Sequence, residues 1–168
     1  MNNRNKSVLS FVIGLSLMVL IAPSIFAHCQ IPCGIYNDEM RFQMIEEDIA
    51  TVEKSMKQIQ ALSKASPVNY NQLVRWINNK EQHATYIQDI VNEYFLTQRI
   101  KPVVTSDEKA YQVYSRKVVV LHQILFYAMK TKQTTDLAHV EKLRALLQEF
   151  HDLYFGPKAA KHLEEHHK

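Results

Sequence analysis

Residues 38–64 read DEMRFQMIEEDIATVEKSMKQIQALSK. Apolar side chains recur in this stretch at spacings of three and four, which places them on one face of an α-helix. They are Phe42, Ile45, Ile49, Val52, Met56, Ile59 and Leu62. The pattern therefore predicts a long amphipathic helix over about 38–64, and Pro67 ends it.

Three further segments repeat this periodicity. The apolar face of the second consists of Leu73, Ile77, Ala84, Ile87, Val91 and Tyr94, before Pro102. The third begins where Thr105 and Glu108 have the spacing of a capping box. Its apolar face consists of Tyr111, Tyr114, Val118, Leu121, Leu125 and Met129. The apolar face of the fourth segment consists of Leu137, Val140, Leu143, Leu147, Phe150 and Tyr154. Gly156-Pro157, which follows, has the composition of a helix stop.

Four long helices with short links predict an all-α fold, an antiparallel four-helix bundle over residues 37–157. The remaining segment, 158–168, is polar and rich in histidine. Because chain ends are usually solvated, we interpret it as a polar tail rather than as a metal site.

The first 27 residues have the composition of a secretory signal peptide. They contain two basic residues and no acid, an apolar stretch over 8–22, and the small residue Ala27 before the expected cut. The apolar stretch is shorter than the roughly 20 residues that a spanning helix needs. Cleavage before His28 is therefore predicted, with export to the periplasm or the medium and no membrane segment in the mature chain.

Cleavage there would remove 27 of the 168 residues and leave 141, which is enough for one domain with a single core. Arg4 and Lys6 would leave with the leader, so the 20 basic side chains would fall to 18, against 17 acidic ones. A nearly neutral domain gives no reason to expect nucleic-acid binding, which needs clustered Lys and Arg.

The residues after the expected cut are His28-Cys29-Gln30-Ile31-Pro32-Cys33-Gly34-Ile35-Tyr36. Here a new terminal amine, a histidine and two cysteines would fall within six residues. Thiolates with nitrogen donors favour a transition metal over Mg²⁺ or Ca²⁺. Zinc usually takes four side-chain ligands, and only three are present. An amine, a backbone amide and two thiolates form a planar N₂S₂ set that suits Ni(II) or Cu(II).

A disulfide between Cys29 and Cys33 is the alternative, because an even cysteine count is ordinary in an exported protein. Pro32 and Gly34 would shape a tight turn, and Tyr36 stands close to it. These neighbours have no role in a simple disulfide, so they favour a metal site. A non-catalytic metal-binding or disulfide-stapled helical protein stays open as the second interpretation.

The pattern His-Cys-x-x-Pro-Cys-Gly-x-Tyr at a mature N-terminus resembles the nickel hook of nickel-containing superoxide dismutase. Lys80-Glu81-Gln82 and Tyr94-Phe95 extend the resemblance into the helical body. It implies a homohexamer of four-helix bundles with one nickel ion per subunit, released from a precursor by a maturation protease. It also implies an antioxidant oxidoreductase that converts superoxide to O₂ and hydrogen peroxide by Ni(II)/Ni(III) cycling.

The same resemblance assigns roles to residues of the hook, defined as residues 28–36. His28 would supply the amine and an axial imidazole, Cys29 its thiolate and backbone amide, and Cys33 the second thiolate. Pro32 would sit in the turn. Tyr36 would act in catalysis with His28, by ordering water and restricting access to the metal.

Residues of the bundle would support the axial imidazole. In the family a glutamate on the first helix and an arginine on the second hold it. Here Glu46 is the predicted acid, with Glu47 as the alternative, and His83 stands where the arginine is expected. Tyr94 resembles the second tyrosine beside the path to the metal.

Overall fold

The computed structural model describes residues 34–156. The predicted hook ligands His28, Cys29 and Cys33 lie outside the described residues, as do Pro32, the leader and the polar tail. The boundaries predicted for these segments therefore stay predictions. Tyr36, together with the predicted supporting residues of the bundle, lies within the described part.

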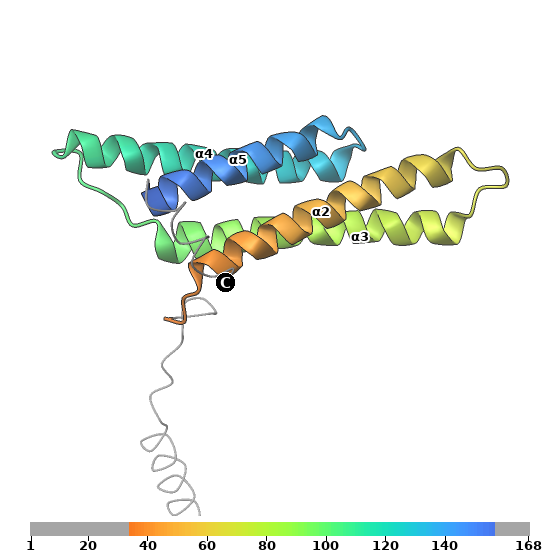
Figure 1. Cartoon of the computed structure of the whole chain (residues 1–168), viewed down its shortest axis with the longest axis horizontal. Helices are drawn as coiled ribbons and strands as arrows, with labels where there is room; N and C mark the ends of the chain where they lie inside the picture. Colours follow the sequence, from red (N-terminus) through yellow and green to blue (C-terminus); the bar gives the residue numbers. More distant parts are fainter. Residues whose placement is uncertain (1–33, 157–168) are drawn as a thin grey trace, which may run out of the picture. The chain divides into compact units, whose positions relative to one another are not determined.

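The described chain folds into helices joined by short loops, and it contains no β-strand. The helices are α2 (Asp38–Ser63), α3 (Tyr70–Asp89), the π-helix η1 (Ile90–Arg99), α4 (Glu108–Gln133) and α5 (Ala138–Phe155). Because η1 continues α3 without a break, the five elements form four continuous helical segments. Figure 1 shows α2 and α3 side by side as one hairpin and α4 and α5 as a second. The predicted all-α helical bundle is confirmed.

The two hairpins bury one apolar core. Its centre is aromatic: the Phe42 ring lies 5.0 Å from Phe95 and 5.3 Å from Phe150, centroid to centroid. Phe95 and Phe150 are completely buried. Since burying one such side chain contributes about 1.5–3 kcal/mol, these rings account for much of the adhesion between α2, η1 and α5. No helix in residues 34–156 is both long and apolar enough to cross a membrane.

The outer end of the α2–α3 hairpin projects beyond α4 and α5 (Figure 1). This explains where the predicted apolar faces fail. On α2 the residues from Phe42 to Met56 are buried as predicted, but Ile59 and Leu62 are only half-buried. On α3, Ala84 and Ile87 are buried, whereas Leu73 is half-buried and Ile77 is exposed. Periodicity indicates the apolar face but not how far a partner covers it.

The predicted start and face of α4 were wrong. The helix is capped by Asp107, whose carboxylate accepts a hydrogen bond from the Ala110 N–H at 3.0 Å, not by Thr105. Of the predicted apolar face only Leu121 is buried. The residues that are buried are Val120, Leu121, Ile124, Ala128 and Thr131. Neighbouring positions on a helix differ by about 100°, so packing against α3 and α5 selects a face displaced by about one residue.

The other helix ends follow their local sequence. Asn37 caps α2 by accepting a hydrogen bond from the Met40 N–H at 3.1 Å. Asn69 caps α3 in the same way through the Gln72 N–H. Gly156 ends α5 with φ of +71°, a left-handed conformation that glycine adopts without strain. The predicted stop at Gly156 is thereby confirmed.

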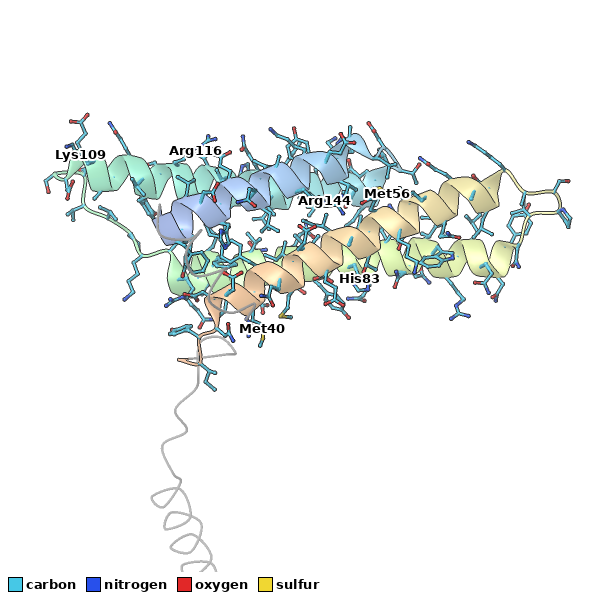
Figure 2. The ribbon with its side chains drawn as sticks, in the orientation of Figure 1. Met40, Met56, His83, Lys109, Arg116 and Arg144 are labelled. Carbon is cyan, nitrogen blue, oxygen red and sulfur yellow. The ribbon has the colours of Figure 1, made fainter. Side chains whose placement is uncertain are left out.

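A polar contact also joins the two hairpins. Arg144 of α5 lies between them in Figure 2, with its Nε 3.0 Å from Glu46 Oε1 and its Nη1 2.7 Å from Glu53 Oε2. Both glutamates belong to α2. Glu46 is therefore engaged in a link between α2 and α5.

Candidate metal centre

Tyr36 is held against the bundle immediately before α2 begins. Its ring lies 4.3 Å from the Arg99 guanidinium carbon and 6.0 Å from the Tyr94 ring, in an edge-to-face arrangement. Its side chain is 47% exposed. The structure thus brings together the two tyrosines that the sequence singled out, with an arginine beside them that the sequence did not indicate.

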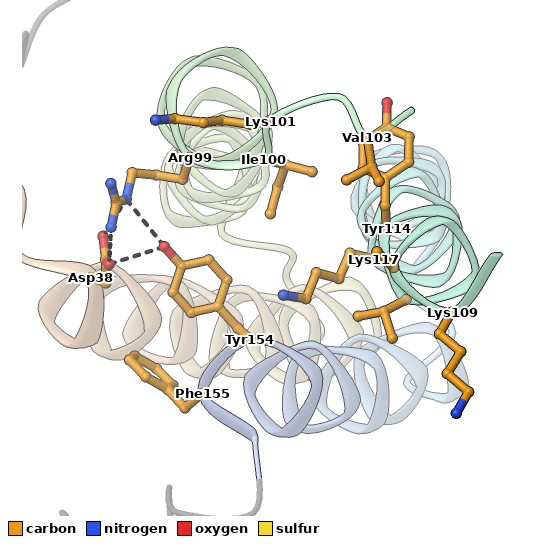
Figure 3. Close-up of a pocket in the computed structure, with 12 residues that line it drawn as sticks. Asp38, Arg99, Ile100, Lys101, Val103, Lys109, Tyr114, Lys117, Tyr154 and Phe155 are labelled. Atoms are coloured by element: carbon orange, nitrogen blue, oxygen red, sulfur yellow. Dashed lines mark hydrogen bonds and ion pairs between the residues drawn. The ribbon is translucent and has the colours of Figure 1, made fainter. Parts of the chain in front are cut away.

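Asp38, the first residue of α2, is the centre of a hydrogen-bond network. Its Oδ1 accepts from Tyr94 Oη at 2.6 Å and from Arg99 Nε at 2.8 Å. Its Oδ2 accepts from Arg99 Nη2 at 2.5 Å and from Tyr154 Oη at 2.9 Å. Figure 3 shows the contacts with Arg99 and Tyr154. We call these four residues the Asp38 network; it ties the start of α2 to the ends of η1 and α5.

The network fixes the protonation of its members. Burial opposes ionisation of Asp38, but hydrogen bonds from Arg99, Tyr94 and Tyr154 outweigh burial, and the pKa of Asp38 lies below its usual value. Burial and the bond to Asp38 raise the pKa of Tyr94 to about 12, and that of Tyr154 to about 12. Both phenols are therefore neutral donors at physiological pH, and neither serves as a ready proton source.

Little in the sequence indicated this network. Tyr154 was predicted as part of an apolar face, and Asp38 is an ordinary first-turn acid. Arg99 reaches Asp38 because η1 is a π-helix, whose wider turn changes the direction in which later side chains point. Side chains of η1 also donate hydrogen bonds to backbone carbonyls five residues earlier, as Thr97 Oγ1 does to the Asn92 carbonyl at 2.7 Å.

His83 lies on α3 with an acidic partner, but that partner is Asp48 and not the predicted Glu46. The distance from His83 Nδ1 to Asp48 Oδ1 is 2.6 Å. Asp48 is only 7% exposed, and burial raises its pKa although the bond to His83 opposes the rise. Positions 46 and 48 differ by about 200° around α2, so they face different neighbours. Glu46 is exposed and binds Arg144.

A cavity of about 330 Å³ adjoins the His83–Asp48 pair. Its lining residues are Met44, Glu47, Asp48, His83, Tyr86, Asp89 and Ile90. Glu47, the alternative to Glu46, therefore lies beside the pair. The His83 ring also meets the Tyr86 ring edge to face at 5.4 Å. In Figure 2, His83 and Met40 lie along the side of the α2–α3 hairpin that faces away from α4 and α5.

Within residues 34–156 no group of three or more histidine, cysteine, aspartate or glutamate side chains could hold a metal ion. Both cysteines of the sequence and His28 lie in the hook, outside that part of the chain. A helical bundle preceded in the sequence by a histidine and two cysteines, whose imidazole and thiolate donors suit a transition metal, points to the class of metalloproteins.

Comparison with protein families identifies the member of that class. The family model for nickel-containing superoxide dismutase matches residues 23–158, which include the hook and the whole described bundle. The chain belongs to the nickel-containing superoxide dismutase family. It is a nickel enzyme that converts superoxide to O₂ and hydrogen peroxide, as the resemblance implied. Comparisons with curated proteins and with solved structures found no match.

Proposed function

We propose that the nickel ion is held by the first six residues of the mature chain. His28 would supply its amine and imidazole, Cys29 its amide nitrogen and thiolate, and Cys33 the second thiolate. This donor set fits nickel, because two soft thiolates and two nitrogens in a plane suit Ni(II), whereas zinc favours four side-chain ligands. Bound there, nickel supplies the Ni(II)/Ni(III) couple that exchanges electrons with superoxide.

The observation that carries this proposal is the anchoring of Tyr36. Cys33 stands only three positions before Tyr36 in the sequence, and Tyr36 is stacked on Arg99 and against Tyr94. Four hydrogen bonds to Asp38 make this support rigid. We infer that the Asp38 network orients the base of the hook, as outer residues orient the ligands of other metal sites.

Each residue of this region then has a role. Tyr36, whose side chain is exposed, would order water and restrict access to the metal. Tyr94, whose hydroxyl donates to Asp38, would hold the Tyr36 ring in place. The two protons that hydrogen peroxide requires would come from solvent, since the pKa of Tyr94 at about 12 makes that phenol a poor donor. His83, paired with Asp48, would orient the His28 imidazole where family members use an arginine.

The precursor would be exported, and a maturation protease would cut it between Ala27 and His28. This step is required by the ligand set, because the amine of His28 exists only after cleavage. The mature subunits would form a homohexamer, as the resemblance implies.

Substitution of the two thiols tests the ligand set. Cys29→Ser and Cys33→Ser should each lose bound nickel and dismutation, while circular dichroism shows the same helix content and unfolding temperature as the parent. The bundle should survive because its core, which includes Ile45, Phe95 and Phe150, contains neither cysteine. Gln30→Ala is the matched control, since it changes the hook without removing a donor.

The outcomes separate the two interpretations. Full nickel occupancy and activity in either cysteine variant would refute the N₂S₂ site. Unfolding of the bundle, with no free thiols in the parent, would instead favour the disulfide.

A further inference from the structure

A second, larger cavity lies between the end of η1, the first half of α4 and the end of α5 (Figure 3). Its volume is about 710 Å³, within the usual range for small-molecule sites. Apolar side chains form much of its wall. They are Ile100, Val103, Ala110, Val113, Tyr114 and Phe155. The cavity is thus far larger than a diatomic substrate requires.

Lys117 is the charged group directed into this cavity. Figure 3 shows its ammonium pointing toward Tyr154, whose ring centroid lies 5.5 Å from Nζ. The side chain is half-buried, and burial lowers the pKa of Lys117. Within residues 34–156 its ammonium has no carboxylate partner; the only acid in the cavity wall, Asp38, is engaged by Arg99, Tyr94 and Tyr154. A half-buried charge without a counter-ion is costly, so the site favours an anion.

The other cations of the wall do not compete for that anion. The Arg99 fork is already bound to both carboxylate oxygens of Asp38. Lys101 and Lys109 are exposed, and Figure 3 shows their ammonium groups directed away from the middle of the cavity. One unpaired positive charge therefore remains among apolar walls. It matches one negative charge; a phosphate dianion would need more donors than the described wall offers.

We propose that this cavity binds a small organic carboxylate, whose single charge pairs with Lys117 and whose apolar body packs on Val103, Val113 and Tyr114. Superoxide and inorganic anions carry charge but would leave these walls uncovered. A neutral apolar molecule would cover the walls but leave Lys117 unpaired. No lining residue belongs to the hook, although Asp38, Arg99 and Tyr154 of the wall also form the Asp38 network. The proposal holds whether or not the proposed nickel ligands are correct.

Isothermal titration of the nickel-loaded protein with hexanoate tests the proposal. Hexanoate should bind saturably at one site per chain, and hexanamide, which has nearly the same shape without the charge, should bind at least tenfold more weakly. Lys117→Met keeps the length of the side chain and should weaken hexanoate binding at least tenfold. Lys117→Arg should retain most of it. Lys142→Met, which removes an exposed lysine of α5 outside the cavity wall, should change nothing.

A second measurement observes Lys117 directly. Saturating hexanoate should raise the pKa of its amine, followed by NMR of ¹³C-labelled lysine, because a carboxylate favours the charged form. Equal binding of hexanamide would overturn the proposal, since the charge would then play no part. Equal binding of azide or phosphate would overturn it as well, since the walls would play none. Unchanged binding in Lys117→Met, or no saturable binding by the parent, would also refute it.

Discussion

At the scale of single residues, Asp38 organises the support for the proposed metal centre. One carboxylate accepts four hydrogen bonds from three side chains that lie far apart in the sequence. Such charge-assisted bonds are stronger than neutral ones, and together they hold Arg99 where Tyr36 stacks on it. The position of Tyr36 therefore depends on Asp38, although none of these contacts joins the two residues directly.

The tyrosines of the network report on Asp38. Burial and then the Asp38 carboxylate raise the pKa of both phenols. Asp38→Asn removes the second cause, so the pKa of Tyr94 and of Tyr154 should fall from about 12 toward the ordinary value of 10.0. Burial remains in this variant and keeps the fall incomplete. NMR titration of ¹³C-labelled tyrosine would measure it residue by residue.

Glu141→Gln provides the comparison, because it removes an exposed carboxylate of α5 at a distance from the network in the fold. Both phenols should titrate there as in the parent. If they also keep a pKa of about 12 in Asp38→Asn, burial alone holds them neutral and the network has no electrostatic role.

At the scale of helices, α2 uses different acids toward different partners. Asp48 meets His83 of α3 with little exposure, whereas Glu46 meets Arg144 of α5 with both side chains substantially exposed. Water weakens the attraction between partly buried charges less than the attraction between exposed charges. The contribution of each contact thus follows from which face of α2 it occupies.

Double-mutant cycles separate these two contacts. Alanine substitution of Asp48 and His83 should give a coupling free energy of about 1 kcal/mol or more, measured by urea unfolding. The cycle on Glu46 and Arg144 should give a smaller coupling free energy, within about 1 kcal/mol of zero.

Dismutation should fall about 10–100-fold in His83→Ala if the His83–Asp48 pair orients the axial ligand, and should stay near the parent value in Glu46→Gln.

Equal coupling free energies in the two cycles would contradict the expectation that the less exposed pair interacts more strongly. Loss of activity in Glu46→Gln, with His83→Ala unaffected, would return the supporting role to Glu46.

At the scale of the whole molecule, the proposed function would require processing of the chain, and the family resemblance implies assembly. The proposed amine ligand does not exist in the precursor. Apolar side chains also remain on the outside of the described bundle, among them Met40, Met44 and Tyr86 on the α2–α3 hairpin and Val119 and Phe126 on α4. In the proposed homohexamer these side chains would be available for contacts between subunits.

Mass spectrometry of the exported, nickel-loaded protein tests the processing step. The chain should begin at His28, because only that end presents an amine next to Cys29. An active protein that keeps Ala27, or any residue before it, would refute the amine ligand.

Sedimentation velocity tests the assembly. The mature protein should sediment as a hexamer, and Met44→Glu should weaken the association if the outer face of the α2–α3 hairpin contributes to it. Glu141→Gln is again a suitable control on a polar surface. A parent protein that sediments as a monomer while fully active would rule out a functional hexamer.

The sequence by itself determined what depends on neighbours along the chain. Helical periodicity and the Gly156 stop are local properties, so the four helical segments could be predicted. The predicted donors of the hook are likewise adjacent in the sequence, and their chemistry indicated the class of metal. Only the tertiary structure decided which face of α4 is buried, that Asp48 rather than Glu46 meets His83, and that residues 38, 94, 99 and 154 form one network. These contacts depend on how the helices pack and on the π-helical turn before Arg99, because periodicity identifies a helix face but not the side chains that will meet it.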